Sequence, residues 1–225
     1  MKTYKIHLVR CGLTEANVQG RYLGRDDVPV CEQGIEQLNY LKETFAYPAV
    51  QAVFTSPLQR CKQTAAILFG NQVPTVEIPN FTEYDFGEFE GFTAEELKDN
   101  EAFKIWLGDN GDAAPPFGES NNHFKARVAV DFEKLVEGLI KTGTTESAVV
   151  VHGGVLMLIL SYFGLPEAPM HDWLCESGCG YTLLVTPSLW MRGRKVEVFD
   201  TFPESIRAAR EHAQEAENND SEDRE

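Results

Sequence analysis

Basic residues are scarce in this chain. Its 225 residues include 20 Lys and Arg against 35 Asp and Glu, which gives a formal net charge of −15. A surface of this sign is repelled by phosphate backbones and acidic lipid, so the composition argues against a nucleic-acid binder or an anionic-membrane binder. A small anionic substrate stays open, because a few arginines in one pocket can dominate the local potential.

Long apolar runs and paired cysteines are also missing. No stretch approaches the ~20 apolar residues that cross a bilayer, so we expect a soluble protein that is not exported. The five cysteines are an odd number spread over a full-size domain, which predicts reduced thiols and a cytoplasmic setting. Cys175 and Cys179 have no second cysteine pair with zinc spacing, so neither a metal site nor a cofactor is predicted.

Short β-type runs alternate with helical periodicity, which predicts an α/β fold with a largely parallel sheet. The predicted strands cover residues 6–9, 52–55, 73–78, 148–151, 181–185 and 195–199, the last two as a hairpin. The predicted helices cover residues 32–45, 56–68, 93–107, 119–140 and 153–163, and a loop is expected at 109–118. We expect one domain over residues 1–203 with a cap-like insertion at about 81–122, followed by a mobile acidic tail at 204–225.

Two predicted strands end in residues that can carry chemistry. Arg10, Cys11 and a glycine follow the first strand, and His152 followed by Gly153 ends the strand at 148–151. Ligands of open α/β sheets bind beyond the carboxyl ends of the strands, and glycine lets a ligand approach the backbone. Arg60 lies in the first turns of a predicted helix, where the helix amino terminus also favours an anion. Each feature alone is weak, and their combination predicts an anion pocket.

Four motifs in sequence order carry a family resemblance. They cover residues 8–17, 55–65, 83–91 and 151–154, and they include Arg10, Arg60, Glu83 and His152. In these motifs the chain resembles the histidine phosphatase superfamily, also called the phosphoglycerate mutase-like family, over nearly its whole length. The resemblance implies a three-layer αβα sandwich with a mostly parallel mixed sheet. It also implies a metal-independent phosphatase that hydrolyses a small phosphomonoester, and residues 86–93 favour the phosphatase branch over the mutases.

The resemblance assigns roles to several residues. Arg10, Arg60 and His152 would hold the phosphate, with Asn17, Arg21 and Gly153 completing the binding site. Glu83 would protonate the leaving alkoxide and then activate water. In family members a histidine that follows the first arginine attacks phosphorus, and the corresponding position here is Cys11.

The cysteine leaves several readings open. A thiol between two guanidiniums should have a lowered pKa and could form a phosphocysteine, but sulfur reaches less far than an imidazole nitrogen. No cysteine has an arginine six positions later, so the loop of cysteine-dependent phosphatases is absent. The chain is therefore predicted to hydrolyse a phosphorylated metabolite through Cys11 or through water activated by Glu83. The alternatives are a silent relative that binds a phosphorylated ligand or partner, and reversible oxidation of an exposed Cys11 thiol. The oligomeric state stays open, with a homodimer as one candidate.

Overall fold

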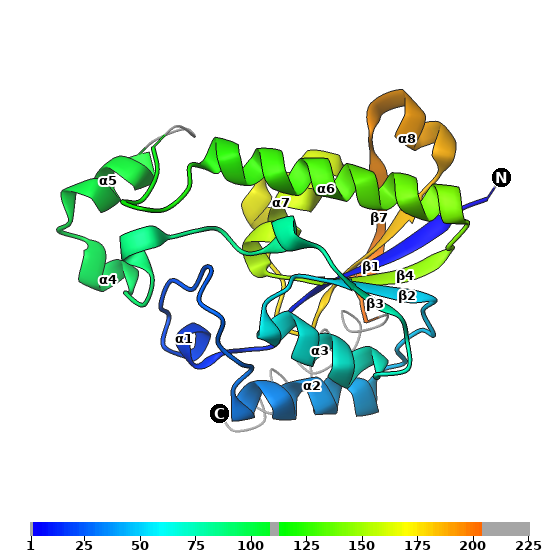
Figure 1. Cartoon of the computed structure of the whole chain (residues 1–225), viewed down its shortest axis with the longest axis horizontal. Helices are drawn as coiled ribbons and strands as arrows, with labels where there is room; N and C mark the ends of the chain where they lie inside the picture. The colour runs from blue at the N-terminus through cyan, green and yellow to red at the C-terminus, as the bar shows by residue number, and fades with distance from the viewer. Residues whose placement is uncertain (1, 109–112, 204–225) are drawn as a thin grey trace, which may run out of the picture.

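A mixed sheet forms the centre of the computed structural model, which describes residues 2–108 and 113–203 (Figure 1). Its strands lie in the order β3-β2-β4-β1-β6-β7-β5. Their bounds are β1 Tyr4–Arg10, β2 Ala52–Thr55, β3 Thr75–Glu77, β4 Glu146–Val151, β5 Gly164–Leu165, β6 Gly180–Val185 and β7 Val196–Phe202. Only β6 pairs antiparallel with its neighbours β1 and β7, and the other pairings of the sheet are parallel. The prediction of a mostly parallel mixed sheet is confirmed.

Helices cover both faces of the sheet, which confirms the predicted three-layer sandwich (Figure 1). Side chains of a strand alternate between faces, so Leu8 packs in the cluster with α6 and α7, while Val9 packs in the cluster with α2 and α3. The longer helices are α2 Glu32–Thr44, α3 Gln59–Phe69, α5 Glu101–Gly108, α6 Asn121–Thr142, α7 Gly153–Phe163 and α8 Pro187–Gly193. The short elements are α1 Glu15–Val18, α4 Ala94–Leu97, η1 Pro79–Phe81, η2 Gly87–Phe89 and η3 Met170–Trp173. In the described part of the chain, none of these helices is long and apolar enough to cross a membrane.

Capping residues explain where the helices of the variable segment, at about residues 81–122, begin and end. The predicted helix 93–107 is wrong as one element, because it divides into α4 and α5. Thr93 and Glu96 form the expected capping box at α4, and the Asn100 side chain then accepts from Phe103 N and begins a second helix. Ser120 caps α6 by accepting from His123 N.

Three further predictions needed correction. The helix predicted from residue 56 begins at Gln59, because Ser56 Oγ accepts a hydrogen bond from Leu58 N while the chain is still extended. The predicted hairpin is wrong in its connection: β6 and β7 are antiparallel neighbours, but α8 lies between them in the chain. The strand predicted at 73–78 is reduced to the short, exposed edge strand β3, and α1 and β5 were not predicted.

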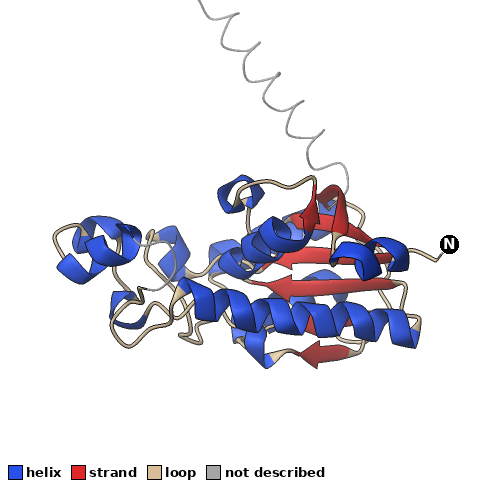
Figure 2. Cartoon of the chain, turned by 90° about the horizontal axis from the view of Figure 1, so that it is seen from above, coloured by secondary structure: helices blue, strands red, loops and turns tan. Residues whose placement is uncertain are grey.

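The segment between β3 and α6 leaves the main body of the domain. Its helices α4 and α5 project beyond the end of the sheet toward which most of the strands run (Figure 2). Phe89, Leu97 and Phe103 form a small separate core there, with Trp106 packed against it. The loop predicted at 109–118 lies partly outside the described residues, and the tail at 204–225 lies entirely outside them.

Candidate active site

The carboxyl ends of two central strands bring the predicted residues together. β1 and β4 are parallel neighbours, and Arg10 at the end of β1 is in register with Val151 at the end of β4. Cys11 N then donates to Val151 O at 2.8 Å, which extends this pairing by one residue. The residues that follow the two strands, Cys11 and His152, are therefore neighbours in space although 141 positions apart.

One cavity of about 210 Å³ lies at this end of the sheet. It is lined by all eight residues that the sequence analysis selected: Arg10, Cys11, Asn17, Arg21, Arg60, Glu83, His152 and Gly153. Tyr22, Phe86, Gly154 and Met157 complete much of the rest of the wall. The cavity combines cationic donors, a thiol and a carboxylate, which are groups that can bind a phosphomonoester and act on it.

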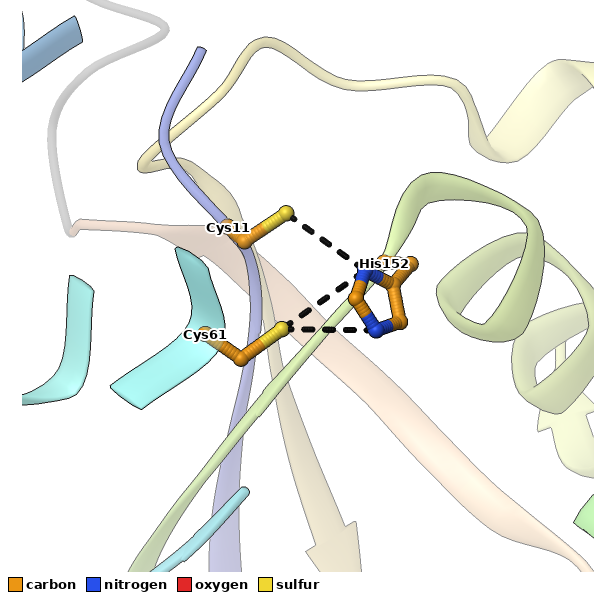
Figure 3. Close-up of side chains that lie close together, drawn as sticks. All are labelled: Cys11, Cys61 and His152. Atoms are coloured by element: carbon orange, nitrogen blue, oxygen red, sulfur yellow. Dashed lines mark hydrogen bonds between the residues drawn. The ribbon is translucent and has the colours of Figure 1, made fainter. Parts of the chain in front are cut away.

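A second thiol lies beside Cys11 and His152. Figure 3 shows Cys11, Cys61 and His152 directed toward one another. Cys11 Sγ lies 3.8 Å from His152 Nδ1, and Cys61 Sγ lies 3.6 Å from both ring nitrogens. Cys61 is fully buried in α3, and the sequence analysis did not select it. Cys11 is only 6% exposed, so the prediction of an exposed thiol is wrong, although the residue lines the cavity.

Hydrogen bonds fix the imidazole of His152. Arg60 Nε donates to His152 Nδ1 at 3.1 Å, so Nε2 carries the proton and donates to Ser56 Oγ at 2.8 Å. The Arg60 guanidinium also donates to Asp26 O at 2.7 Å and to Gly24 O at 2.6 Å. Arg60 is 2% exposed, so its charge is held in the wall beside the imidazole and the thiols.

The surroundings favour the thiolate form of Cys11. The Cys61 thiol, as a hydrogen-bond donor, holds the pKa of the Cys11 thiol well below its ordinary value. The Arg60 guanidinium acts in the same direction, and these groups outweigh burial, which raises the pKa. Burial raises the pKa of the Cys61 thiol well above its ordinary value, and the neighbouring Cys11 adds to this rise. Cys11 therefore loses its proton more readily than Cys61.

The same three side chains are also a candidate metal set. One ligand atom from each of Cys11, Cys61 and His152 lies within 4.8 Å of the others, and thiolate and imidazole suit zinc. Both ring nitrogens are engaged, however, since Nδ1 accepts from Arg60 and Nε2 donates to Ser56. An ion on either nitrogen would have to displace one of these partners. The arrangement fits a thiolate stabilised by cationic groups better than a metal centre.

Two backbone amides hold the Glu83 carboxylate at the opposite wall. Its Oε1 accepts from Tyr84 N at 2.9 Å and its Oε2 accepts from Gly154 N at 2.8 Å, at the amino terminus of α7. The absence of a Cβ atom at Gly154 leaves room for this carboxylate, and a larger residue there would displace it. The carboxylate is 8% exposed and lines the cavity, where it can exchange a proton with a bound ligand.

An ion pair that the sequence analysis missed supports the Glu83 segment. Arg127 of α6 donates to the Glu119 carboxylate at 2.9 and 2.5 Å and to Glu83 O at 2.8 Å. Burial raises the pKa of Glu119, but Arg127 outweighs it and holds the pKa below its ordinary value. Ser120 caps α6, and Glu119 pairs with Arg127. This pair positions the backbone of Glu83.

Hydrogen bonds and close packing hold the remaining predicted residues. Arg10 Nη1 donates to Cys175 O at 2.5 Å, and a Cβ atom at Gly153 would lie 3.4 Å from Arg10 Nε. The Asn17 side chain is held by its oxygen, which accepts from Thr14 N and Thr14 Oγ1. Arg21 pairs with Glu96 at 2.9 Å and donates to the Gly91 carbonyl, and its side chain is partly exposed.

A larger and mostly apolar cavity adjoins the first. Its volume is about 580 Å³, and it shares Tyr22, Glu83, Phe86, Gly154 and Met157 with the smaller cavity. The rest of its wall includes Tyr84, Trp106, Phe124, Lys125 and the two asparagines that begin α6. Trp106 Nε1 donates to the Tyr84 hydroxyl at 2.9 Å, which fixes both rings. Sequence patterns gave no sign of this cavity, because its aromatic residues come from four separate segments of the chain.

Comparison with known proteins gives a consistent result. The family model of the histidine phosphatase superfamily (branch 1) matches residues 6–218. The adenosylcobalamin/alpha-ribazole phosphatase of Salmonella typhimurium is 32% identical over 180 residues, which cover 78% of this chain and 87% of that protein. The crystal structure of the alpha-ribazole phosphatase of Shigella flexneri superposes with a TM-score of 0.74 at 28% identity, covering 87% of this chain and 95% of that one. A phosphoglycerate mutase of Bacillus anthracis, at 19% identity and a TM-score of 0.72, shares the fold over 88% of this chain and 92% of its own.

Proposed function

Because the chain belongs to the histidine phosphatase superfamily (branch 1), we propose that it is a phosphomonoesterase whose nucleophile is the Cys11 thiolate. One observation carries this proposal. The thiol whose pKa is lowered lines the same cavity as Arg10, Arg60, His152 and the Glu83 carboxylate. A phosphate monoester carries close to two negative charges, and this end of the sheet concentrates cationic and hydrogen-bonding groups in an otherwise acidic protein.

The proposed reaction has two steps. Cys11 Sγ attacks phosphorus, the bond from phosphorus to the ester oxygen breaks, and Glu83 gives its proton to the leaving alkoxide. Glu83 then takes a proton from water, the resulting hydroxide attacks phosphorus, and the sulfur–phosphorus bond breaks to return the thiolate. Arg10, Arg60 and His152 offset the charge on the phosphoryl oxygens in both steps. No metal ion takes part in this scheme.

One observation favours the alternative of a silent phosphate-binding protein. Arg60 already donates to His152 and to the carbonyls of Gly24 and Asp26. Fewer of its donors are therefore free for phosphate than in a guanidinium without such partners. A cysteine sulfur also reaches less far from the backbone than an imidazole nitrogen, and a misplacement of ~1 Å can cost about a hundredfold in rate. A protein of this kind would bind a phosphorylated ligand without turnover.

Trapping the covalent intermediate tests the proposal. Rapid quenching of the protein with an aryl phosphate, followed by peptide mass spectrometry, is expected to show one phosphoryl group on Cys11. At about pH 6, well below the ~8.5 at which a free thiol ionises, this adduct should still form because the pKa of Cys11 is lowered. Turnover with no adduct on Cys11 would instead support hydrolysis by water that Glu83 activates. A ligand-induced rise in melting temperature without any turnover would support the silent alternative.

We propose further that the alcohol part of the substrate is large and carries an aromatic group. The apolar cavity of about 580 Å³ begins at Glu83, where the leaving oxygen would be protonated, and continues to Trp106 and Phe124. Lys125 and Asn121 add polar groups at its wall. Two relatives are named alpha-ribazole phosphatases, so an alpha-ribazole phosphate is one candidate substrate to test beside simple aryl phosphates.

Removal of the Trp106 ring is expected to weaken substrate binding without slowing the chemical step. Trp106→Ala should raise KM for a bulky aryl phosphate about tenfold, because a ring contact of this kind is worth about 1.4 kcal/mol, while kcat stays near its original value. KM for glycerol phosphate should change little. Ile105→Ala, next to it on α5 and 64% exposed, is the matched control and should change neither constant. An equal rise in KM for both substrates would contradict an aromatic subsite.

A further inference from the structure

We propose that Cys11 and Cys61 form a covalent modification site, in which a hydroperoxide oxidises Cys11 and Cys61 closes a disulfide with it. This inference rests on the proposed function, because it describes how the same nucleophile is withdrawn and recovered. It begins from the position of Cys61, which follows Arg60 in α3 and lies with its sulfur within 4.8 Å of the Cys11 sulfur (Figure 3).

The two thiols differ in access. Cys11 lines the cavity of about 210 Å³, so a small peroxide that enters this cavity can reach its sulfur. Cys61 is fully buried behind it and does not line the cavity. The first oxidation is therefore directed to Cys11, and Cys61 is protected until a reactive sulfur forms beside it.

The two thiols also differ in charge. The Cys61 thiol and the Arg60 guanidinium stabilise negative charge on Cys11, and the thiolate is the form that attacks peroxides. Burial keeps Cys61 protonated while Cys11 is a thiolate. Once Cys11 is oxidised to the uncharged sulfenic acid, the negative neighbour that opposes ionisation of Cys61 is gone. The Cys61 thiol then ionises more easily than it did beside the Cys11 thiolate.

The chemistry balances with the peroxide as the only oxidant. The Cys11 thiolate attacks one peroxide oxygen, the oxygen–oxygen bond breaks, and Cys11 sulfenic acid and hydroxide result after proton transfer. The Cys61 thiol loses its proton to that hydroxide, and its sulfur attacks the Cys11 sulfur. The sulfur–sulfur bond forms, the sulfur–oxygen bond breaks, and the second oxygen leaves as hydroxide, which takes a proton from solvent water or buffer. Two thiols are oxidised by two electrons and one peroxide is reduced.

The separation of the two sulfur atoms is short enough to be closed by side-chain movement. They lie within 4.8 Å of each other and have to approach to about 2.05 Å, so the inference requires rotation about one or both Cα–Cβ bonds. Cys31 is not part of this buried cluster, since its side chain is half-buried at the start of α2. The disulfide would remove the nucleophile reversibly and would protect it from irreversible oxidation to the sulfinic acid.

Peptide mapping of the full chain tests this inference. After treatment with hydrogen peroxide and alkylation with N-ethylmaleimide, trypsin cleavage behind Arg10 and Arg60 places each thiol at the start of its own peptide. We expect these two peptides to be joined and to separate on reduction with dithiothreitol. Alkylation of both thiols after peroxide treatment, or a disulfide from Cys11 to another cysteine, would overturn the inference. This readout needs no turnover, so it is distinguishable from a failure of the proposed phosphatase activity.

Activity measurements add a second test. Peroxide should lower phosphatase activity at least about tenfold, and dithiothreitol should restore it in the wild type and in the control variant Cys31→Ala. In Cys61→Ala, whose fold is checked by thermal melting, the same treatment should cause a loss that dithiothreitol does not reverse. Full recovery in Cys61→Ala would show that Cys61 does not protect Cys11 and would contradict the inference.

Discussion

Cys11→Ser is expected to lower kcat for p-nitrophenyl phosphate by roughly 10³-fold or more. A serine hydroxyl in this position keeps its proton near neutral pH, because the hydrogen-bond donor Cys61 and the cationic groups that ionise a thiol cannot ionise an alcohol to the same extent. Phosphate binding should persist, since Arg10, Arg60 and His152 are unchanged. The measurement is steady-state turnover together with the shift in melting temperature caused by inorganic phosphate.

The matched control is Cys31→Ser, which replaces a thiol outside the cluster and should leave kcat unchanged. If Cys11→Ser retains turnover, hydrolysis by water that Glu83 activates is the better account. Cys11→His tests the remaining alternative, in which the natural chain binds phosphate without turnover. Turnover that is absent in the wild type and appears only in Cys11→His would show that the rest of the pocket is competent and that the natural chain is a silent relative.

The effect of Glu83→Gln on kcat is expected to depend on the leaving group of the substrate. For an alkyl phosphate, whose alkoxide has to be protonated as it leaves, kcat should fall roughly 10²- to 10⁴-fold. For p-nitrophenyl phosphate, whose phenolate leaves without a proton, the first step should change far less. The side chain keeps its size, but one of the two carboxylate oxygens becomes an NH2 group. This group cannot accept a hydrogen bond, so either Tyr84 N or Gly154 N loses its acceptor. The ratio of the two kcat values is the measured quantity.

A nearby glutamate provides the control for this prediction. Glu88→Gln changes an exposed carboxylate in the same segment, and neither substrate should respond to it. An equal loss for alkyl and aryl phosphates in Glu83→Gln would contradict proton donation. It would instead indicate that the carboxylate mainly orients the amino terminus of α7 through Gly154.

Sequence patterns predicted most of the fold and the outline of the pocket. Parallel strands place their carboxyl ends at one edge of a sheet, so residues that directly follow β1 and β4 had to meet once the strands were recognised. The selected residues of the small cavity therefore followed from the motifs and their order along the chain. Helix boundaries in the variable segment were less predictable, since they depend on caps such as Asn100, which interrupts an otherwise helical pattern.

Local periodicity in the sequence predicted the α/β class and the order of the main strands. The sandwich and the eight selected residues of the small cavity were predicted from the motifs and from the family that they resemble. Only the tertiary structure decided which other groups surround the thiol and the carboxylate. Cys61 reads as a core position of a helix, and adjacent helical residues ordinarily point about 100° apart. The first turn of α3 nevertheless passes so close to His152 that Arg60 and Cys61 both reach the imidazole. Packing of distant segments, which no local pattern encodes, made that contact and the aromatic cavity beside it.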